Sequence, residues 1–202
     1  MVINAELKKC TLSFTESTIV NLKTLTEKKA KAVIEKLKSL SLTLTLAESC
    51  TAGLVSGLLV NTQGVSSVLW GSFVCYTQES KVQMLGLNNE KLTLDGLVSR
   101  QTALSMAEGA LQKSSADIAA AVTGLAGPGH DGISPVGTIW VATAMRCGKN
   151  EVKGYLFTAD PDTKFEPKKL KSDKEELNRN LIRICAAEAL LELILKSIRD
   201  NN

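Results

Sequence analysis

The sequence predicts an α/β fold: a three-layer α/β/α sandwich around a mixed sheet of about five strands. Helical and strand patterns alternate along the first half of the chain, which is typical of parallel strands joined by helices. Two strand-like segments, 136–146 and 151–159, then follow each other around a short turn and indicate an antiparallel hairpin. With 202 residues and 44% hydrophobic content, the chain is long enough for one domain with a sizeable core.

The first half of the chain is organised around a strand that leads into a helix. Residues 18–40 space apolar side chains as a helix does, and 42–46 alternate Leu and Thr with the period of a strand. A second helix begins near Leu54. The remaining elements are a strand at 68–77, a short helix at 80–85, a helix at 99–113 and a buried strand at 117–123.

Two segments toward the ends of the chain lack the regular apolar patterns of its centre. Residues 1–16 show no period and are interpreted as a loosely ordered N-terminal extension, which leaves 17–202 as a single domain. Residues 158–172 are polar, contain two prolines and are interpreted as a loop insertion. A capping box then opens a final amphipathic helix at 173–198.

Composition excludes several classes of protein. Twenty-four basic residues against 21 acidic ones leave a net charge of +3, too little to indicate nucleic-acid binding. No apolar run approaches the roughly 18 residues of a membrane span, and the N-terminus lacks the layout of a secretion signal. Five irregularly spaced cysteines favour reduced thiols. We therefore expect a cytoplasmic protein.

Ser49 lies where the strand at 42–46 turns into the next helix. Backbone N–H groups at the start of a helix lack partners inside it and can hold an anion or oxyanion. Ser49 is therefore a candidate nucleophile. The alternative is that Ser49 or Thr51 only caps the helix, a common role for both residue types.

A serine nucleophile needs a base, and the sequence offers few. The one histidine, His130, lies in a glycine-rich loop, and no metal-binding cluster is recognisable. A buried lysine can act as the base, with a tyrosine to relay the proton. Lys81 and Tyr76 follow the next strand, whose end would lie near Ser49 in a parallel sheet. Lys81 as a surface charge and Tyr76 as a core-edge aromatic remain the alternatives.

The glycines at 124, 127 and 129 follow a strand, as in dinucleotide-binding folds, but they lead into another strand rather than a helix. They form either a phosphate-binding turn or a simple connecting loop.

Several separate motifs together resemble one family. They are the segment Ala-Glu-Ser-Cys-Thr-Ala-Gly at 47–53, and the segments 71–81, 96–99, 122–128 and 135–140, followed by Arg179 and Arg183. In this order they resemble the CinA C-terminal domain family of nicotinamide-mononucleotide deamidases, over about residues 20–200.

The resemblance implies a CinA-like fold and hydrolysis of the carboxamide of nicotinamide mononucleotide (NMN) to nicotinate mononucleotide and ammonia, without a metal or other cofactor. It also implies that the protein is a homo-oligomer and that it binds a small-molecule nucleotide as its substrate. The implied catalytic residues are Ser49 as nucleophile, Lys81 as general base and Tyr76 in the proton relay. The implied substrate-binding residues are Thr123, Gly124, Arg179 toward the phosphate, and Cys50 and Thr51 through their N–H groups.

Three departures from the family pattern bear on these roles. Ala52 replaces a glycine of the first motif, and the long insertion separates Arg179 from the preceding strand. The loop at 127–135 is short and carries His130 and Asp131 where the family is richer in glycine. Two other functions therefore stay open: a catalytically weak relative that binds a nucleotide or a protein partner, and an amidase for a different amide.

Overall fold

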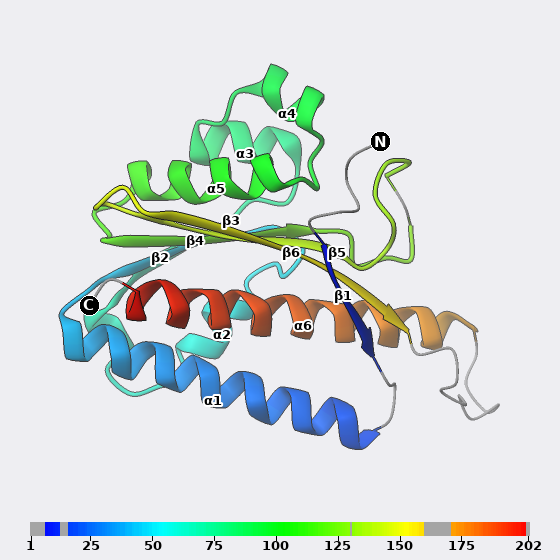
Figure 1. Ribbon diagram of the computed structural model, residues 1–202, viewed down its shortest axis with the longest axis horizontal. Coiled ribbons are helices and arrows are strands. Elements are labelled where there is room, and N and C mark those ends of the chain that lie inside the picture. The colour runs from blue at the N-terminus through cyan, green and yellow to red at the C-terminus, as the bar shows by residue number, and fades with distance from the viewer. Residues whose placement is uncertain (1–6, 13–15, 130, 160–170, 201–202) are drawn as a thin grey trace.

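The computed structural model describes residues 7–12, 16–129, 131–159 and 171–200. A six-stranded mixed sheet lies between two layers of helices (Figure 1), which confirms the predicted sandwich. The strands are β1 (Leu7–Leu12), β2 (Leu44–Glu48), β3 (Leu69–Val74), β4 (Ile118–Gly124), β5 (Thr138–Met145) and β6 (Asn150–Ala159). The helices are α1 (Glu16–Leu40), α2 (Leu54–Leu59), α3 (Gln78–Leu85), α4 (Asn89–Asp95), α5 (Arg100–Lys113) and α6 (Lys171–Arg199), with a short 3-10 turn at Val65–Ser67.

The sheet has the order β1-β6-β5-β4-β2-β3. β2 lies between β3 and β4 and is parallel to both, whereas β5 is antiparallel to β4 and β6 as the predicted hairpin requires. The carboxyl ends of three parallel neighbours therefore meet at one edge of the sheet, where α/β proteins place their ligands.

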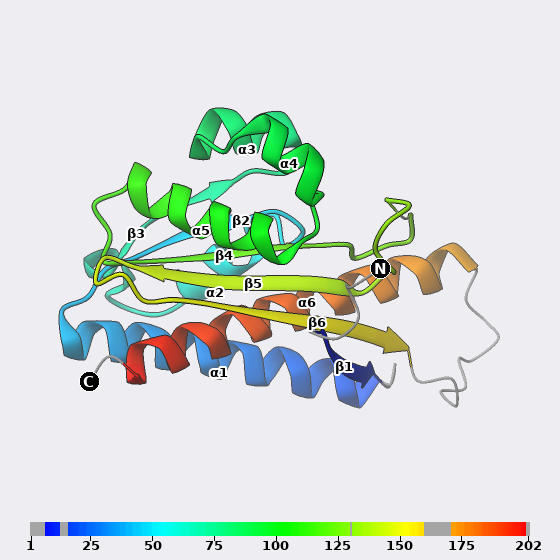
Figure 2. The same ribbon diagram turned by 45° about the horizontal axis from the view of Figure 1, so that its top comes forward.

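The central strand β4 divides the core into two layers. Ile118, Ala120 and Val122 pack in the cluster shared with α1, α2 and α6, and Ala119 and Ala121 pack in the cluster shared with α5. All five are fully buried. Figure 2 shows α1 and α6 running side by side below the sheet, with α3, α4 and α5 on the opposite face.

The sixth strand corrects part of the sequence interpretation. β1 falls within the predicted loose extension, but it pairs in parallel with β6 and so is an ordered edge strand. Its pattern is weak because it is only half-buried and carries adjacent Lys8 and Lys9, in keeping with the charged residues that blunt exposed edges. Residues 1–6 and 13–15 lie outside the described residues, as do His130 and residues 160–170 of the predicted insertion.

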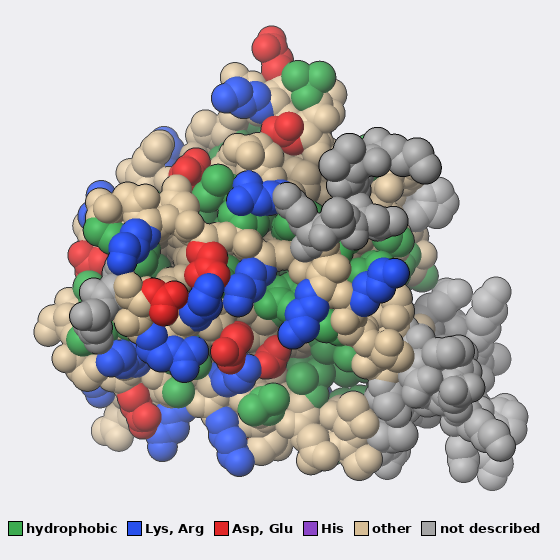
Figure 3. Space-filling model, viewed as in Figure 1, with side chains coloured by type: hydrophobic (Ala, Val, Ile, Leu, Met, Phe, Trp, Pro, Cys, Tyr) green, Lys and Arg blue, Asp and Glu red, His purple; other side chains and the backbone are tan. Residues whose placement is uncertain are grey.

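The described surface carries charges of both signs. On the face in Figure 3, Lys and Arg side chains are interspersed with Asp and Glu rather than gathered in a field of one sign. Within the described residues, no helix combines the length and apolar character needed to cross a bilayer.

Candidate active site

The turn between β2 and α2 is built on the side chain of Glu48. This fully buried carboxylate accepts hydrogen bonds from the N–H groups of Gly53 (3.0 Å), Val55 (3.0 Å) and Ser56 (2.9 Å). These are N–H groups that the start of a helix leaves without partners. Glu48 therefore caps α2 from the end of the preceding strand and fixes where the turn between them runs.

The capping alternative for Ser49 and Thr51 is not what the structure shows. Gly53 occupies the N-cap position of α2 in a left-handed conformation, and as a glycine it has no side chain of its own to cap the helix. Ala52 before it is also left-handed, with φ of 49°, a conformation that costs a residue with a Cβ roughly 1–2 kcal/mol. Ser49 is thus free for another role.

Lys81 reaches Ser49 from α3. Its Nζ lies 3.0 Å from Ser49 Oγ, 3.0 Å from the carbonyl oxygen of Cys75 and 3.3 Å from that of Tyr76. A neutral amine has two N–H donors and one lone pair, which fits two carbonyls and one serine hydroxyl. The ammonium form would donate to all three, so a proton can pass from Ser49 to Lys81 without rearrangement of these contacts.

The surroundings favour the neutral amine. Lys81 is 1% exposed, burial lowers its pKa, and it forms no ion pair with a carboxylate among the described residues. The same burial raises the pKa of Cys50 to about 12 and of Cys75 to about 11. Because a cysteine reacts as its thiolate, these neighbouring thiols are poor nucleophiles, and Ser49 stays the candidate nucleophile of this turn.

Two backbone N–H groups of the turn have acceptors and, in the described ranges, the two between them do not. The N–H of Ser49 donates to the carbonyl of Val122 (3.0 Å), and that of Ala52 donates to the carbonyl of Ser49 (3.1 Å). The N–H groups of Cys50 and Thr51 have no acceptor within the described part of the chain. Ser49 and Cys50 retain 7% and 5% exposure, whereas Thr51 is fully buried. Cys50 is therefore the more accessible residue of the two, and the oxyanion role of either N–H stays a prediction.

Arg179 lies at the edge of this site despite the insertion before it. One guanidinium nitrogen donates to the hydroxyl of Tyr76 (2.9 Å), and the other donates to the carbonyl of Gly127. The Tyr76 side chain is 55% exposed, and no hydrogen bond joins its hydroxyl to Ser49 or Lys81 in the described residues. Tyr76 is thus placed beside Arg179, and its role in a proton relay stays a prediction.

Thr123 and Gly124 end β4 next to the turn. The Thr123 hydroxyl donates to the carbonyl of Leu97 (2.7 Å) and so ties β4 to the segment that precedes α5. A Cβ at Gly124 would lie 2.3 Å from Cδ1 of Ile139, so the glycine allows β5 to approach. Contact of either residue with substrate stays a prediction.

Two further residues hold the backbone of the site, and no sequence pattern indicated a role for either. They are Glu48, described above, and Arg183, whose Nε and a terminal nitrogen donate to the carbonyls of Cys50 (3.2 Å) and Thr51 (2.8 Å). Arg183 lies one helical turn after Arg179, a spacing that places two side chains on the same face of a helix. That spacing was the one available signal.

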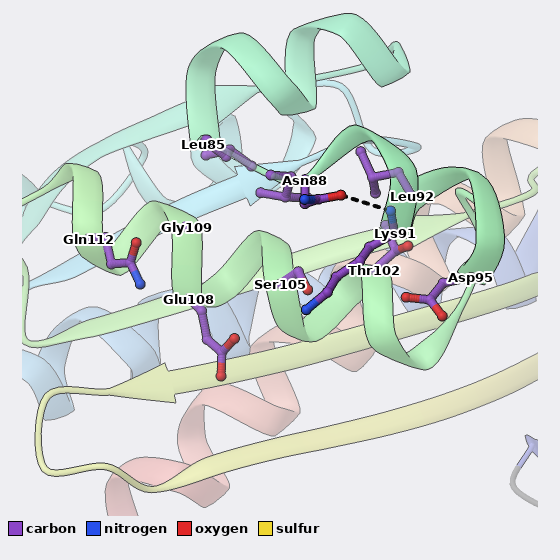
Figure 4. A pocket seen from close by; sticks show the side chains of 12 residues that line it. Leu85, Asn88, Lys91, Leu92, Asp95, Thr102, Ser105, Glu108, Gly109 and Gln112 are labelled. Atoms are coloured by element: carbon purple, nitrogen blue, oxygen red, sulfur yellow. Dashed lines mark hydrogen bonds between the residues drawn. The ribbon is translucent and has the colours of Figure 1, made fainter.

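The cavity in Figure 4 is separate from this site. It has a volume of about 180 Å³ and lies between α4 and α5, with Asn88, Lys91, Ser105 and Glu108 among its lining residues. Neither Ser49 nor Lys81 lines it. In the described ranges, no three His, Cys, Asp or Glu side chains form a group that could hold a metal ion.

Comparison with known proteins gives consistent results. The family model of the CinA C-terminal domain matches residues 26–166. The nicotinamide-nucleotide amidohydrolase PncC of Escherichia coli K12 is 38% identical over 134 residues, which cover 66% of this chain and 81% of that protein. A CinA-like protein of Chloroherpeton thalassium is 44% identical over 130 residues, which cover 62% of this chain but only 31% of that longer relative.

A solved structure agrees in fold. The crystal structure of the competence/damage inducible protein CihA from Agrobacterium tumefaciens superposes with a TM-score of 0.74 at 37% identity, covering 87% of this chain and 96% of that one.

Proposed function

Because the chain belongs to the CinA C-terminal domain family, we propose that it is a serine amidohydrolase that converts NMN to nicotinate mononucleotide and ammonia. The observation that carries the proposal is the buried amine of Lys81, 3.0 Å from the hydroxyl of Ser49. The relative named nicotinamide-nucleotide amidohydrolase supports the choice of substrate. A serine hydroxyl is a weak nucleophile unless a base lies beside it, and this pair meets that need.

The first half of the proposed reaction forms an ester. Neutral Lys81 takes the proton of Ser49 as Oγ attacks the carboxamide carbon of the substrate. The carbonyl oxygen becomes an oxyanion, which accepts a hydrogen bond from the Cys50 N–H. Lys81 then gives its proton to the departing nitrogen, the C–N bond breaks, and ammonia leaves. The product of this half is an ester between Ser49 Oγ and the carboxyl group of nicotinate mononucleotide.

The second half removes the acyl group by the same contacts. Lys81, neutral again, takes a proton from water as the water oxygen attacks the ester carbon. The C–O bond to Ser49 then breaks, Lys81 returns the proton to Oγ, and nicotinate mononucleotide leaves. One residue thus serves as base and acid in both halves, which its three contacts permit.

Substrate binding is assigned to the other edge of the site. The guanidinium of Arg179 is a fixed cation that can engage the phosphate of a nucleotide through two donors. Tyr76 holds it through their hydrogen bond of 2.9 Å. Two further expectations remain part of this proposal: the homo-oligomer that the resemblance implies and the cytoplasmic location that the composition favours.

The test is ammonia release from NMN, measured with a chelator present. The wild-type protein should turn over, and Ser49→Ala and Lys81→Met should lose activity by at least about 10²-fold. Ser105→Ala and Lys91→Ala change the same residue types at the cavity of Figure 4 and should match the wild type. Binding of NMN without turnover by the wild type would instead favour a binding protein, and neither binding nor turnover would favour a different amide.

A further inference from the structure

The turn that follows Ser49 is anchored at both ends by groups already described. At its start, the Ser49 N–H donates to the carbonyl of Val122. At its end, the Glu48 carboxylate holds the N–H groups of Gly53, Val55 and Ser56. Between these anchors lie the peptide groups of residues 50–52. Among the described residues, the one side chain that hydrogen-bonds to these peptide groups is Arg183.

The contacts of Arg183 lead, through two peptide planes, to the proposed oxyanion donor. In a trans peptide the C=O of one residue and the N–H of the next lie in one plane and point in opposite directions. Arg183 donates to the carbonyl of Thr51 (2.8 Å) and so fixes the plane that contains the Ala52 N–H. That N–H donates to the carbonyl of Ser49 (3.1 Å), which in turn shares a plane with the Cys50 N–H.

From this chain of contacts we infer that Arg183 is a positioning residue, which sets the direction of the Cys50 N–H and so prepares the oxyanion site. The inference rests on the proposed function. Arg183 touches neither Ser49 nor Lys81 by a hydrogen bond in the described residues. Its partners are the two backbone carbonyls and, at 3.5 Å, the side-chain oxygen of Asn180 on the same helix. It acts on the reaction through the peptide groups that it holds.

The second contact of Arg183 strengthens the same arrangement. Its Nε donates to the carbonyl of Cys50 (3.2 Å), which fixes the plane that contains the Thr51 N–H. Both carbonyls therefore point toward α6, and the N–H groups of their planes point away from it. A cation bound to an amide carbonyl also polarises that amide, so the hydrogen bonds along the chain reinforce one another.

The two arginines of α6 thus have different tasks. Arg179 faces the hydroxyl of Tyr76 and the carbonyl of Gly127 at the substrate edge, and Arg183 faces the nucleophile turn. The consequence is a split in kinetic parameters. An interaction made only in the transition state affects kcat, and one made equally with bound substrate affects KM.

The geometry of Arg183 also determines which substitution is informative. Its fork binds two successive carbonyls at once, which a lysine cannot do because an ammonium is a point charge on a flexible stem. Arg183→Lys keeps the charge and most of the aliphatic chain but loses the fork. It therefore separates orientation of the turn from the general electrostatics of the site.

The experiment measures kcat and KM for NMN in the wild type, Arg183→Lys and Arg179→Gln, with thermal unfolding of each protein recorded. Arg183→Lys should lower kcat by about 10²-fold, the effect of a lost oxyanion donor, and leave KM within about threefold. Arg179→Gln should mainly raise KM. The affinity for NMN in the Ser49→Ala background should follow the same division, unchanged by Arg183→Lys and weakened by Arg179→Gln.

A second variant tests the same role in case Arg183→Lys folds poorly. In Arg183→Ala, added guanidinium ions should restore part of kcat, because they can occupy the vacated site, and added ammonium ions should not. If the wild type turns over NMN and folded Arg183→Lys keeps the same kcat, the positioning role is wrong, while the proposed function still holds. Raised KM without loss of kcat would make Arg183 a substrate-binding residue instead. An inactive wild-type protein would refute the proposed function, and this role with it.

Discussion

Replacement of Glu48 by glutamine tests how the nucleophile turn is held. One carboxylate oxygen accepts from Gly53 and Val55, and the other accepts from Ser56 and, at 3.4 Å, from the hydroxyl of Ser72. A glutamine keeps a single acceptor oxygen. Its best orientation retains the first pair, turns its NH₂ toward Ser72, and leaves the Ser56 N–H without an acceptor.

The expected cost follows from that lost hydrogen bond. A bond to a charged group contributes about 1.5–3 kcal/mol, and an unsatisfied buried donor costs about 1–3 kcal/mol. Since these two figures overlap in what they count, we expect Glu48→Gln to lower the free energy of unfolding by about 2–4 kcal/mol. A lower kcat should accompany this loss, because the turn that carries Ser49 and the Cys50 N–H is less firmly held.

Urea-induced unfolding measures this change, with the slope of the transition as a check that both states stay comparable. Glu27→Gln, an exposed position within α1, is the matched control and should stay within about 0.5 kcal/mol of the wild type. If Glu48→Gln proved as mild as this control, the carboxylate would not be the anchor of the turn.

Three further predictions concern strain, the proton relay and the base. Ala52→Gly should stabilise the fold by about 0.5–1 kcal/mol in urea unfolding, since the relief of left-handed strain exceeds the added entropy of a glycine; a loss of stability would contradict this. Tyr76→Phe should raise KM by about 2- to 10-fold through its lost bond to Arg179, whereas a fall in kcat of about 10²-fold would place Tyr76 in the proton relay. Because burial lowers the pKa of Lys81 and the base must be neutral, kcat/KM should rise with pH through a pKa below the usual value of about 10.4 and fall at lower pH. If kcat/KM instead rose with a pKa at the ordinary lysine value, this would argue against Lys81 as the base.

Much of the fold was predictable because its central elements carry regular patterns. The Leu and Thr alternation before Ser49 predicted β2, and the small apolar run at 117–123 predicted the buried β4. Two elements were missed, the short helix α4 and the strand β1, and edge position explains the second. β1 has Lys8 and Lys9 side by side and partial burial, so its sequence shows no clear alternation, and its order comes from pairing with β6.

The site was predictable where function depends on side chains at strand ends. Ser49 and Lys81 follow neighbouring parallel strands, and the structure brings their side chains to 3.0 Å. Roles that depend on backbone atoms were not visible. The carbonyls of Cys50 and Thr51 have no signature in the sequence, so nothing identified Arg183 as their partner. The direction of the Tyr76 hydroxyl toward Arg179 likewise required the tertiary structure.

The central claim is that Ser49 attacks the substrate and carries its acyl group. The most direct test is mass spectrometry of protein quenched with acid during turnover of NMN. We expect the acyl group of nicotinate mononucleotide, as an ester, on the peptide that contains Ser49. It should be located on that residue by fragmentation and be absent from Ser49→Ala. Turnover with no acyl group on Ser49, or with the group on Cys50 instead, would contradict it.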